Sequence, residues 1–136
     1  MTVVRSGESA LVTEQDVVLA RQQVRKLSIE IGLSLVDQTK IVTATSELAR
    51  NTVIYGGGGI LLWEIIDRDF NRGLRLTFSD EGPGIPNLDL ALTDGWTSGK
   101  GMGMGLSGSR RLVSEFDIVS EPGKGTKVTI IRWKKS

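Results

Sequence analysis

Apolar residues recur every three or four positions near the start of the chain, which predicts an amphipathic helix. Thr13 with Asp16 is typical of an N-terminal cap, and Gly32 suits the position just after the last turn. Between these signals lies an apolar stripe made of Val17, Ala20, Val24, Leu27 and Ile31. We expect this stripe to face a hydrophobic core.

A second helix is predicted by the same kind of pattern, with Ser34 as its cap and its end near Tyr55. Three polar residues, Thr43, Glu47 and Asn51, are spaced four apart and therefore share one face. Solvent exposure would explain such a row, but the row lies beside the apolar stripe rather than opposite it. That position also suits the edge of a cleft. The stripe consists of Leu35, Val42, Leu48, Ala49 and Val53.

Alternation of apolar and polar residues with a period of two predicts strands in other parts of the chain. A short first strand at 9–12 follows a loose start at Ser6 and Gly7. Two hairpins are expected further on, each around a turn signal. The first joins strands 60–67 and 74–78 around Asn71-Arg72-Gly73, and the second joins 116–121 and 126–133 around Pro122-Gly123-Lys124-Gly125.

Two shorter helices complete the prediction, one over 88–92 and one from Leu106 to about Ser114. The order of elements predicts an α/β (α+β) fold, a two-layer sandwich whose mostly antiparallel mixed sheet carries helices on one face. No repeat or linker interrupts the pattern, so we expect a single domain over residues 1–136.

The composition restricts the possible chemistry. The chain contains no histidine and no cysteine. Ser-His-Asp catalysis, phosphohistidine relays, thiolate zinc sites and cysteine nucleophiles are therefore excluded. A general base near neutral pH must be a carboxylate or, less favourably, a desolvated lysine or tyrosine.

The charge balance gives no reason to expect a nucleic acid or an anionic membrane as partner, because the net charge is only +1. The hydrophobic fraction of 39% is ordinary for a globular domain. No apolar run is long enough to span a membrane, and the start of the chain lacks a signal-peptide pattern. We expect a cytoplasmic protein.

A glycine-rich segment, residues 96–106, stands out from the rest of the chain. Glycines at 99, 101, 103 and 105 alternate with other residues, and a helical pattern follows. Such a segment can bring backbone N–H groups close to an anion, which favours a phosphate-binding loop; a mobile surface loop is the alternative. Gly103, Gly105 and Gly108 match the dinucleotide fingerprint, but no strand precedes them. The Walker A pattern also fails, because the spacing is one residue short and no Ser or Thr follows Lys100.

Three stretches of the chain resemble the nucleotide-binding motifs of the GHKL ATPase superfamily, and they occur in the same order. Members of this superfamily share the Bergerat ATP-binding fold. Residues 46–51, Ser-Glu-Leu-Ala-Arg-Asn, are similar to its N box. Residues 80–85, Asp-Glu-Gly-Pro-Gly-Ile, are similar to its first glycine box, and residues 99–106 to its second. The resemblance covers about residues 10–133. The short lid and the stretch from Val36 to Tyr55 are most similar to the stressosome switch kinases within the anti-sigma-factor kinase group.

The resemblance implies ATP and Mg²⁺ as cofactors and gives several residues a role. Asn51 would be the protein ligand of Mg²⁺, a hard cation that prefers oxygen ligands. Asp80 would accept the adenine amino group, with Thr126 supporting that contact. Glu47 would be the catalytic general base. The other expected nucleotide-binding residues are Gly82, Gly84 and Ile85 near the base, and Gly99, Lys100, Gly101, Met102, Gly103, Met104, Gly105 and Leu106 near the phosphates.

Some of these roles have alternatives. Lys100 would contact the γ-phosphate or else be a solvated residue of the lid, and the side chains of Met102 and Met104 are expected to pack rather than to bind. Arg50 would contact a substrate or partner, or form a structural ion pair.

The resemblance also implies an activity and partners. It favours an ATP-dependent serine/threonine kinase that phosphorylates STAS-domain antagonist and scaffold proteins and, when released, activates a PP2C-type phosphatase. An anti-sigma-factor kinase of the same fold that sequesters a sigma factor is the alternative. A nucleotide-binding module without catalysis is a third hypothesis, against which the retained Glu47 argues.

Overall fold

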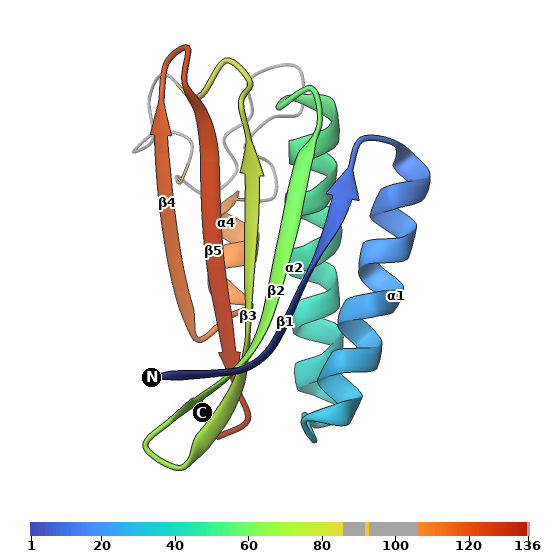
Figure 1. The fold of residues 1–136 in the computed structure, drawn as a ribbon, viewed down its shortest axis with the longest axis vertical. Helices are drawn as coiled ribbons and strands as arrows, with labels where there is room; N and C mark the ends of the chain where they lie inside the picture. Colours follow the sequence, from blue (N-terminus) through green and yellow to red (C-terminus); the bar gives the residue numbers. More distant parts are fainter. Residues whose placement is uncertain (86–91, 93–105, 136) are drawn as a thin grey trace.

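Five strands form one antiparallel sheet in the order β1-β2-β3-β5-β4 within the described part of the chain (Figure 1). The computed structural model describes residues 1–85, 92 and 106–135. Along the chain the elements are β1 (Thr2–Leu11), α1 (Glu14–Glu30), α2 (Leu35–Ile54), β2 (Gly59–Arg68), β3 (Asn71–Asp80), α4 (Leu106–Arg111), β4 (Glu115–Glu121) and β5 (Gly125–Trp133).

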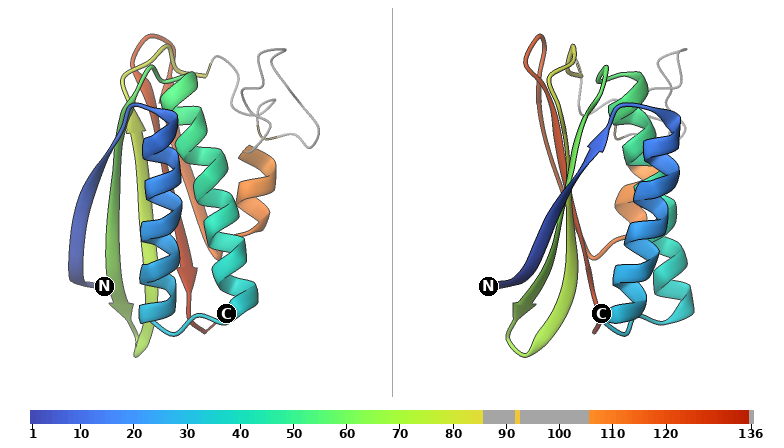
Figure 2. Two further views of the ribbon diagram at one scale, coloured as in Figure 1. Left: turned by 90° about the vertical axis from the view of Figure 1, so that its right-hand side faces the viewer. Right: turned by 45° about the vertical axis from the view of Figure 1, so that its right-hand side comes forward.

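The helices α1, α2 and α4 cover one face of the sheet, so the molecule has two layers (Figure 2). The core between them is formed by the apolar stripes of α1 and α2 and by the inward-facing residues of the strands. All five residues of the stripe predicted for α1 are buried. The predicted two-layer α/β architecture is therefore confirmed.

Both long helices begin with the predicted caps. The Thr13 hydroxyl accepts the N–H of Asp16 at 3.2 Å, and the Asp16 carboxylate accepts the N–H of Thr13 at 3.1 Å. Backbone N–H groups of Val12 and Thr13 lower the pKa of Asp16. Ser34 accepts the N–H of Asp37 at 3.1 Å in the same manner. Each cap satisfies N–H groups that have no partner inside the helix.

A mostly buried ion pair anchors α2 to the sheet. Asp37, in the first turn of α2, accepts a hydrogen bond from the Arg132 guanidinium of β5 at 2.5 Å. The same guanidinium donates to the backbone carbonyl of Leu112, which follows α4, at 3.4 Å. One arginine thus connects α2, β5 and the end of α4.

The prediction that Leu35 belongs to the buried stripe of α2 is wrong, since its side chain is 71% exposed. Leu35 is the first residue of α2, and the first buried residue of this helix is Ile41. The side of the first turn that carries Leu35 therefore faces solvent, whereas Asp37 of the same turn contacts the sheet. Val42, Leu48 and Ala49 are buried as predicted.

The first strand is longer than the predicted 9–12, because β1 begins at Thr2 and pairs with β2 over its whole length. It is an edge strand whose residues are mostly exposed on both faces. An exposed edge strand needs no apolar alternation, so its first half has no hydrophobic pattern that sequence analysis can detect.

The turn of the first hairpin also differs from the prediction. The two turn residues are Asp69 and Phe70, both with positive φ (52° and 64°), and Arg68 pairs with Asn71. Asn71 lies in β3, where its side-chain amide exchanges two hydrogen bonds with the backbone of Lys135, at 3.0 and 3.1 Å. The polar residue that suggested a turn instead fixes the end of the chain.

The prediction of a helix over 88–92 lies outside the described residues, except for Leu92, which packs against the core. Among the helices that the structure does describe, none combines the length and the apolar character needed to cross a membrane.

The strained turn makes a prediction about stability. A phenylalanine in the left-handed region is disfavoured by about 1–2 kcal/mol, and a two-residue turn of this kind prefers glycine at its second position. The Phe70 side chain is fully exposed, so its removal costs no packing. Phe70→Gly should therefore raise the free energy of unfolding by about 1 kcal/mol, as measured by urea denaturation.

A matched control is Val119→Gly on the edge strand β4, where the side chain is also exposed but no positive φ occurs. This change should lower the stability, because glycine weakens a strand. A loss of stability in Phe70→Gly would show that the turn is not strained.

Candidate functional site

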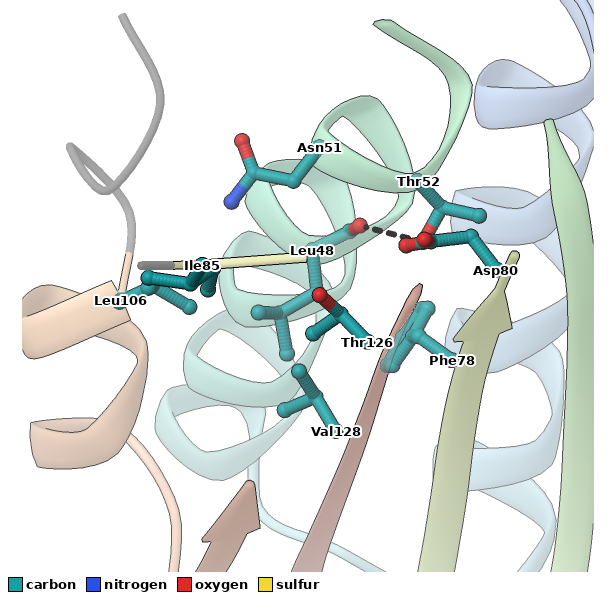
Figure 3. Close-up of a pocket in the computed structure, with 9 residues that line it drawn as sticks. All are labelled: Leu48, Asn51, Thr52, Phe78, Asp80, Ile85, Leu106, Thr126 and Val128. Atoms are coloured by element: carbon teal, nitrogen blue, oxygen red, sulfur yellow. Dashed lines mark hydrogen bonds between the residues drawn. The ribbon is translucent and has the colours of Figure 1, made fainter. Parts of the chain in front are cut away.

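A pocket lies between the helix layer and the end of the sheet where β3 finishes and β5 starts (Figure 3). Most of its wall is apolar, and a few polar groups converge on it. The lining residues are Leu48, Asn51, Thr52, Phe78, Asp80, Ile85, Leu106, Thr126 and Val128. An apolar pocket with a small number of placed polar groups is the usual form of a site for a small organic ligand.

The register of the sheet explains why these residues meet. Asp80 pairs with Thr126 across β3 and β5, and Phe78 pairs with Val128 two positions further in. Residues two apart on a strand face the same side, and directly paired residues do as well. The sheet therefore presents a polar pair at its end and an apolar pair immediately behind it. The sequence prediction that Asp80 and Thr126 share a site agrees with this geometry.

Asp80 is the most unusual group in the pocket. Its carboxylate accepts the N–H of Gly82 at 2.9 Å. Burial raises the pKa of Asp80, while backbone hydrogen bonds from Gly82 and Thr126 act in the opposite direction. The result is a half-buried carboxylate that can accept hydrogen bonds but cannot donate them while it is ionised.

The glycines around Asp80 are explained by close packing. A Cβ atom at Gly56 would collide with the Asp80 carboxylate, and one at Gly82 would lie 2.7 Å from the Cα of Gly56. The end of α2 and the segment after β3 can therefore approach only because both residues lack side chains. In the sequence, Gly56 is the first of four consecutive glycines, and no motif distinguishes it from the other three.

Gly84 and Ile85 complete this wall of the pocket. Gly84 has a φ of 77°, and a Cβ there would collide with the carbonyl of Glu121. Ile85 is buried, and its N–H donates to the Ser120 hydroxyl at 2.8 Å. The first glycine box is thus held against the turn between β4 and β5.

The helix layer contributes the predicted N-box residues. Asn51 lines the pocket from α2, across from Asp80 and Thr126 on the sheet (Figure 3). Glu47 lies one turn earlier, is half-buried and does not line the pocket itself. No hydrogen bond or ion pair to another described residue holds its carboxylate.

Near Asn51 the part of the chain that the structure describes offers too few oxygen ligands to hold a metal ion alone. A metal ion there would need further ligands from a bound nucleotide and from water. Among the described residues, no group of three or more Asp, Glu, His or Cys side chains lies close enough to hold a metal ion. Magnesium binds few protein oxygens when phosphates and water complete its octahedron, and the single amide oxygen of Asn51 fits that case.

The predicted phosphate-binding residues are described only in part. Leu106 is buried at the start of α4 and lines the pocket. The predicted residues from Gly99 to Gly105, including Lys100, Met102 and Met104, lie outside the described residues.

Four pocket residues were not found from the sequence. They are Leu48, Thr52, Phe78 and Val128. The sequence contains a pattern that could have indicated each of them. Leu48 and Thr52 are four apart and share a face of α2, and Phe78 and Val128 lie two positions from Asp80 and Thr126 on their strands. The Thr52 hydroxyl donates to the Leu48 carbonyl at 3.0 Å, a bond drawn in Figure 3.

Arg50 lies on a different face of α2, where it lines a shallow groove together with Val18 and Arg21 of α1. It forms no ion pair with another residue of the described ranges. Both roles expected for Arg50, a contact to a substrate or partner and a structural ion pair, therefore stay predictions.

Comparison with known proteins places the chain in a family. Residues 36–136 match the family model described as histidine kinase-, DNA gyrase B- and HSP90-like ATPase. The serine/threonine-protein kinase RsbT of Bacillus subtilis is 43% identical over 124 residues, which cover 90% of this chain and 92% of RsbT. The anti-sigma F factor of Clostridium acetobutylicum is 30% identical over 116 residues, which cover 80% of this chain and 79% of that protein.

Two solved structures show the same fold. One contains the RsbU and RsbW domains of a Mycobacterium tuberculosis protein, with a TM-score of 0.63, 23% identity, and 95% of this chain and 32% of that chain covered. The other is the SiaB–SiaC complex from Pseudomonas aeruginosa, with a TM-score of 0.54, 11% identity, and 96% and 90% covered. At these identities the likeness concerns the fold alone. Together with the family model and the relatives, it shows that the chain belongs to the histidine kinase-, DNA gyrase B- and HSP90-like ATPase family.

Proposed function

We propose that this protein is an ATP-dependent serine/threonine kinase of a bacterial partner-switching stress-response pathway. The observation that carries the proposal is the meeting of Asn51 and Asp80 across one apolar pocket, on a chain 43% identical to a serine/threonine-protein kinase. The pocket would thus combine a half-buried acceptor for a base with an amide that holds the metal ion of the phosphates. The proposed pathway acts in the cytoplasm.

The sheet side of the pocket would bind adenine. The Asp80 carboxylate accepts a hydrogen bond from the exocyclic amino group, since adenine presents a donor there. Leu48, Ile85 and Val128 supply apolar surface for the faces of the ring. Gly82 and Gly84 bring the backbone close to the edge of the base, and Thr126 adds a hydroxyl beside Asp80.

The helix side would bind the phosphates and the metal. Asn51 offers its amide oxygen to Mg²⁺, which when bound neutralises phosphate charge. The glycine pattern of residues 99–106 suits backbone N–H contacts to the phosphates, and Lys100 would contact the γ-phosphate. These contacts hold the terminal phosphate in position, which is most of what phosphoryl transfer requires.

Glu47 would act as the general base. A serine or threonine hydroxyl of the substrate forms a bond from its oxygen to the γ-phosphorus, and the bond from that phosphorus to the bridging oxygen of ADP breaks. The proton of the hydroxyl passes to the Glu47 carboxylate. The place of Glu47 one turn before Asn51, and its lack of a partner among the described residues, support this role.

The proposed substrates are STAS-domain antagonist and scaffold proteins, and the proposed target of the released kinase is a PP2C-type phosphatase. The likeness to RsbT favours this assignment. Sequestration of a sigma factor is the second candidate, because the anti-sigma F factor of Clostridium acetobutylicum is also similar over 80% of this chain.

A phosphoryl-transfer assay tests the proposed activity. The chain is incubated with Mg²⁺, ATP labelled at the γ-phosphate and purified STAS-domain proteins. Glu47→Gln should slow the transfer by about 10²–10⁴ and leave the affinity for ADP unchanged, because the base contributes to chemistry rather than to binding. Glu8→Gln on the exposed edge strand is the matched control and should have no effect.

Absence of transfer by the unmutated chain to every STAS protein tested would contradict the proposed activity. Stable capture of a sigma factor in the same mixture would instead favour the second candidate.

Replacing Asp80 should weaken nucleotide binding without lowering the stability of the folded protein. Asp80→Asn should weaken ADP binding about tenfold to a hundredfold in calorimetry, as expected for a lost hydrogen bond to a charged group. Because burial raises the pKa of Asp80 above 3.8, the folded state holds its proton more tightly than the unfolded chain. The contribution of Asp80 to stability is therefore lost as the pH rises from 3.8 through the raised pKa.

The ligand-free Asp80→Asn protein should accordingly melt no lower than the unmutated chain at neutral pH. In the unmutated chain, ADP affinity should begin to fall at a higher pH than the usual value of 3.8 suggests. Asp117→Asn, at an exposed position of β4, is the control. Equal ADP affinity in Asp80→Asn and the control would remove Asp80 from the site.

A further inference from the structure

Ser120 connects two segments at the pocket, the first glycine box and the start of β5, through one hydroxyl group. It lies on the edge strand β4 and faces the helix layer, on the same side as Phe116 and Ile118. Its oxygen accepts the N–H of Ile85 at 2.8 Å. It also lies 3.1 Å from the Gly125 carbonyl oxygen and 2.9 Å from the Thr126 hydroxyl oxygen.

The donors and acceptors in this cluster have only one arrangement that satisfies all three contacts. The Gly125 carbonyl can only accept, so the single hydrogen of Ser120 must point at it. The Thr126 hydroxyl must then donate its own hydrogen to Ser120. Ser120 thereby uses its hydrogen and accepts both the Ile85 N–H and the Thr126 hydroxyl.

This arrangement makes the Thr126 hydroxyl a hydrogen-bond acceptor toward the pocket. With its hydrogen directed at Ser120, the Thr126 oxygen offers only lone pairs to the space between α2 and the sheet, into which Figure 3 shows it pointing. Asp80, its partner across the sheet, is an acceptor as well. The end of the sheet therefore presents two neighbouring acceptors and no hydroxyl donor.

We infer that Ser120 is a positioning residue that sets purine selectivity by holding Thr126 as an acceptor. The inference rests on the proposed nucleotide binding and deepens it. The amino group of a 6-amino purine has two hydrogens, one for the Asp80 carboxylate and one for the Thr126 oxygen. The contact to Thr126 is either direct or passes through a water molecule. A 6-oxo purine offers one N–H, at N1, and places an acceptor at position 6, so one of the two acceptors of the site is left facing another acceptor. A site with such a mismatched polar group rejects the ligand. Without Ser120, the Thr126 hydroxyl is free to turn and donate to the oxo group.

The test compares the binding of ADP and inosine diphosphate, which differ at purine position 6, by calorimetry on the full chain with Mg²⁺. The unmutated protein should prefer ADP. Ser120→Ala should reduce the ratio of the two affinities by about threefold to tenfold, the value of one ordinary hydrogen bond. Loss of the acceptor for Ile85 affects both nucleotides alike, so the ratio isolates the effect on Thr126. Ser120→Thr keeps the hydroxyl and should keep the ratio.

A double-mutant cycle tests whether Ser120 acts through Thr126. Thr126→Val should lower the ratio, and adding Ser120→Ala to it should lower the ratio no further. If Ser120→Ala does not fold, Ser120→Cys, whose thiol is a weak donor and acceptor, should change the ratio in the same direction.

An unchanged ratio in Ser120→Ala or Thr126→Val, or a further fall in the double mutant, overturns the inference while the proposed nucleotide binding stands. Failure of the unmutated chain to bind either nucleotide overturns both.

Discussion

A carboxylate placed in an apolar wall is unfavourable unless donors compensate for its lost hydration. Asp80 is such a carboxylate, and much of the surrounding structure serves to accommodate it. Backbone N–H groups of Gly82 and Thr126 donate to it, and Gly56 leaves room for it. Burial has the larger influence on the pKa of Asp80, which it raises, so the compensation by these donors is partial. A ligand that offers a further donor would complete it, which is the physical basis of the proposed preference for adenine.

The two sides of the pocket come from different layers of the fold, and β5 takes part in fixing both. The sheet side depends on the β3–β5 register, which aligns Asp80 with Thr126. The helix side depends on α2, whose start is held by the Ser34 cap and by the ion pair between Asp37 and Arg132. The pocket exists only when the two layers are packed together, so folding and binding share the same core.

The sequence predicted those parts of the molecule that follow a periodic apolar pattern or contain residues typical of caps and turns. The stripe of α1, the caps and the second hairpin are of this kind. The edge strand β1 and the Asp69-Phe70 turn were not predicted, because an exposed strand carries no apolar alternation and phenylalanine is not a turn residue. Leu35 was misplaced, because a helical pattern does not reveal where packing against the other layer begins.

For the site, the motifs pointed to Asn51, Asp80, Ile85, Leu106 and Thr126, and the structure brings these five around one pocket. Gly56 and Ser120 could not be found from the sequence, since their roles arise from contacts between distant segments. Glycine beside other glycines resembles a simple break, and a serine near a strand end resembles an ordinary polar residue. Their importance depends on the register of the sheet, which no local pattern encodes.

The most direct test of the account is a crystal structure of the chain with ADP and Mg²⁺. The account predicts the adenine ring between Leu48 and Val128, its amino group within hydrogen-bonding distance of the Asp80 carboxylate, and the metal on the Asn51 side of the pocket. An adenine ring bound elsewhere, such as in the groove beside Arg21 and Arg50, would contradict it.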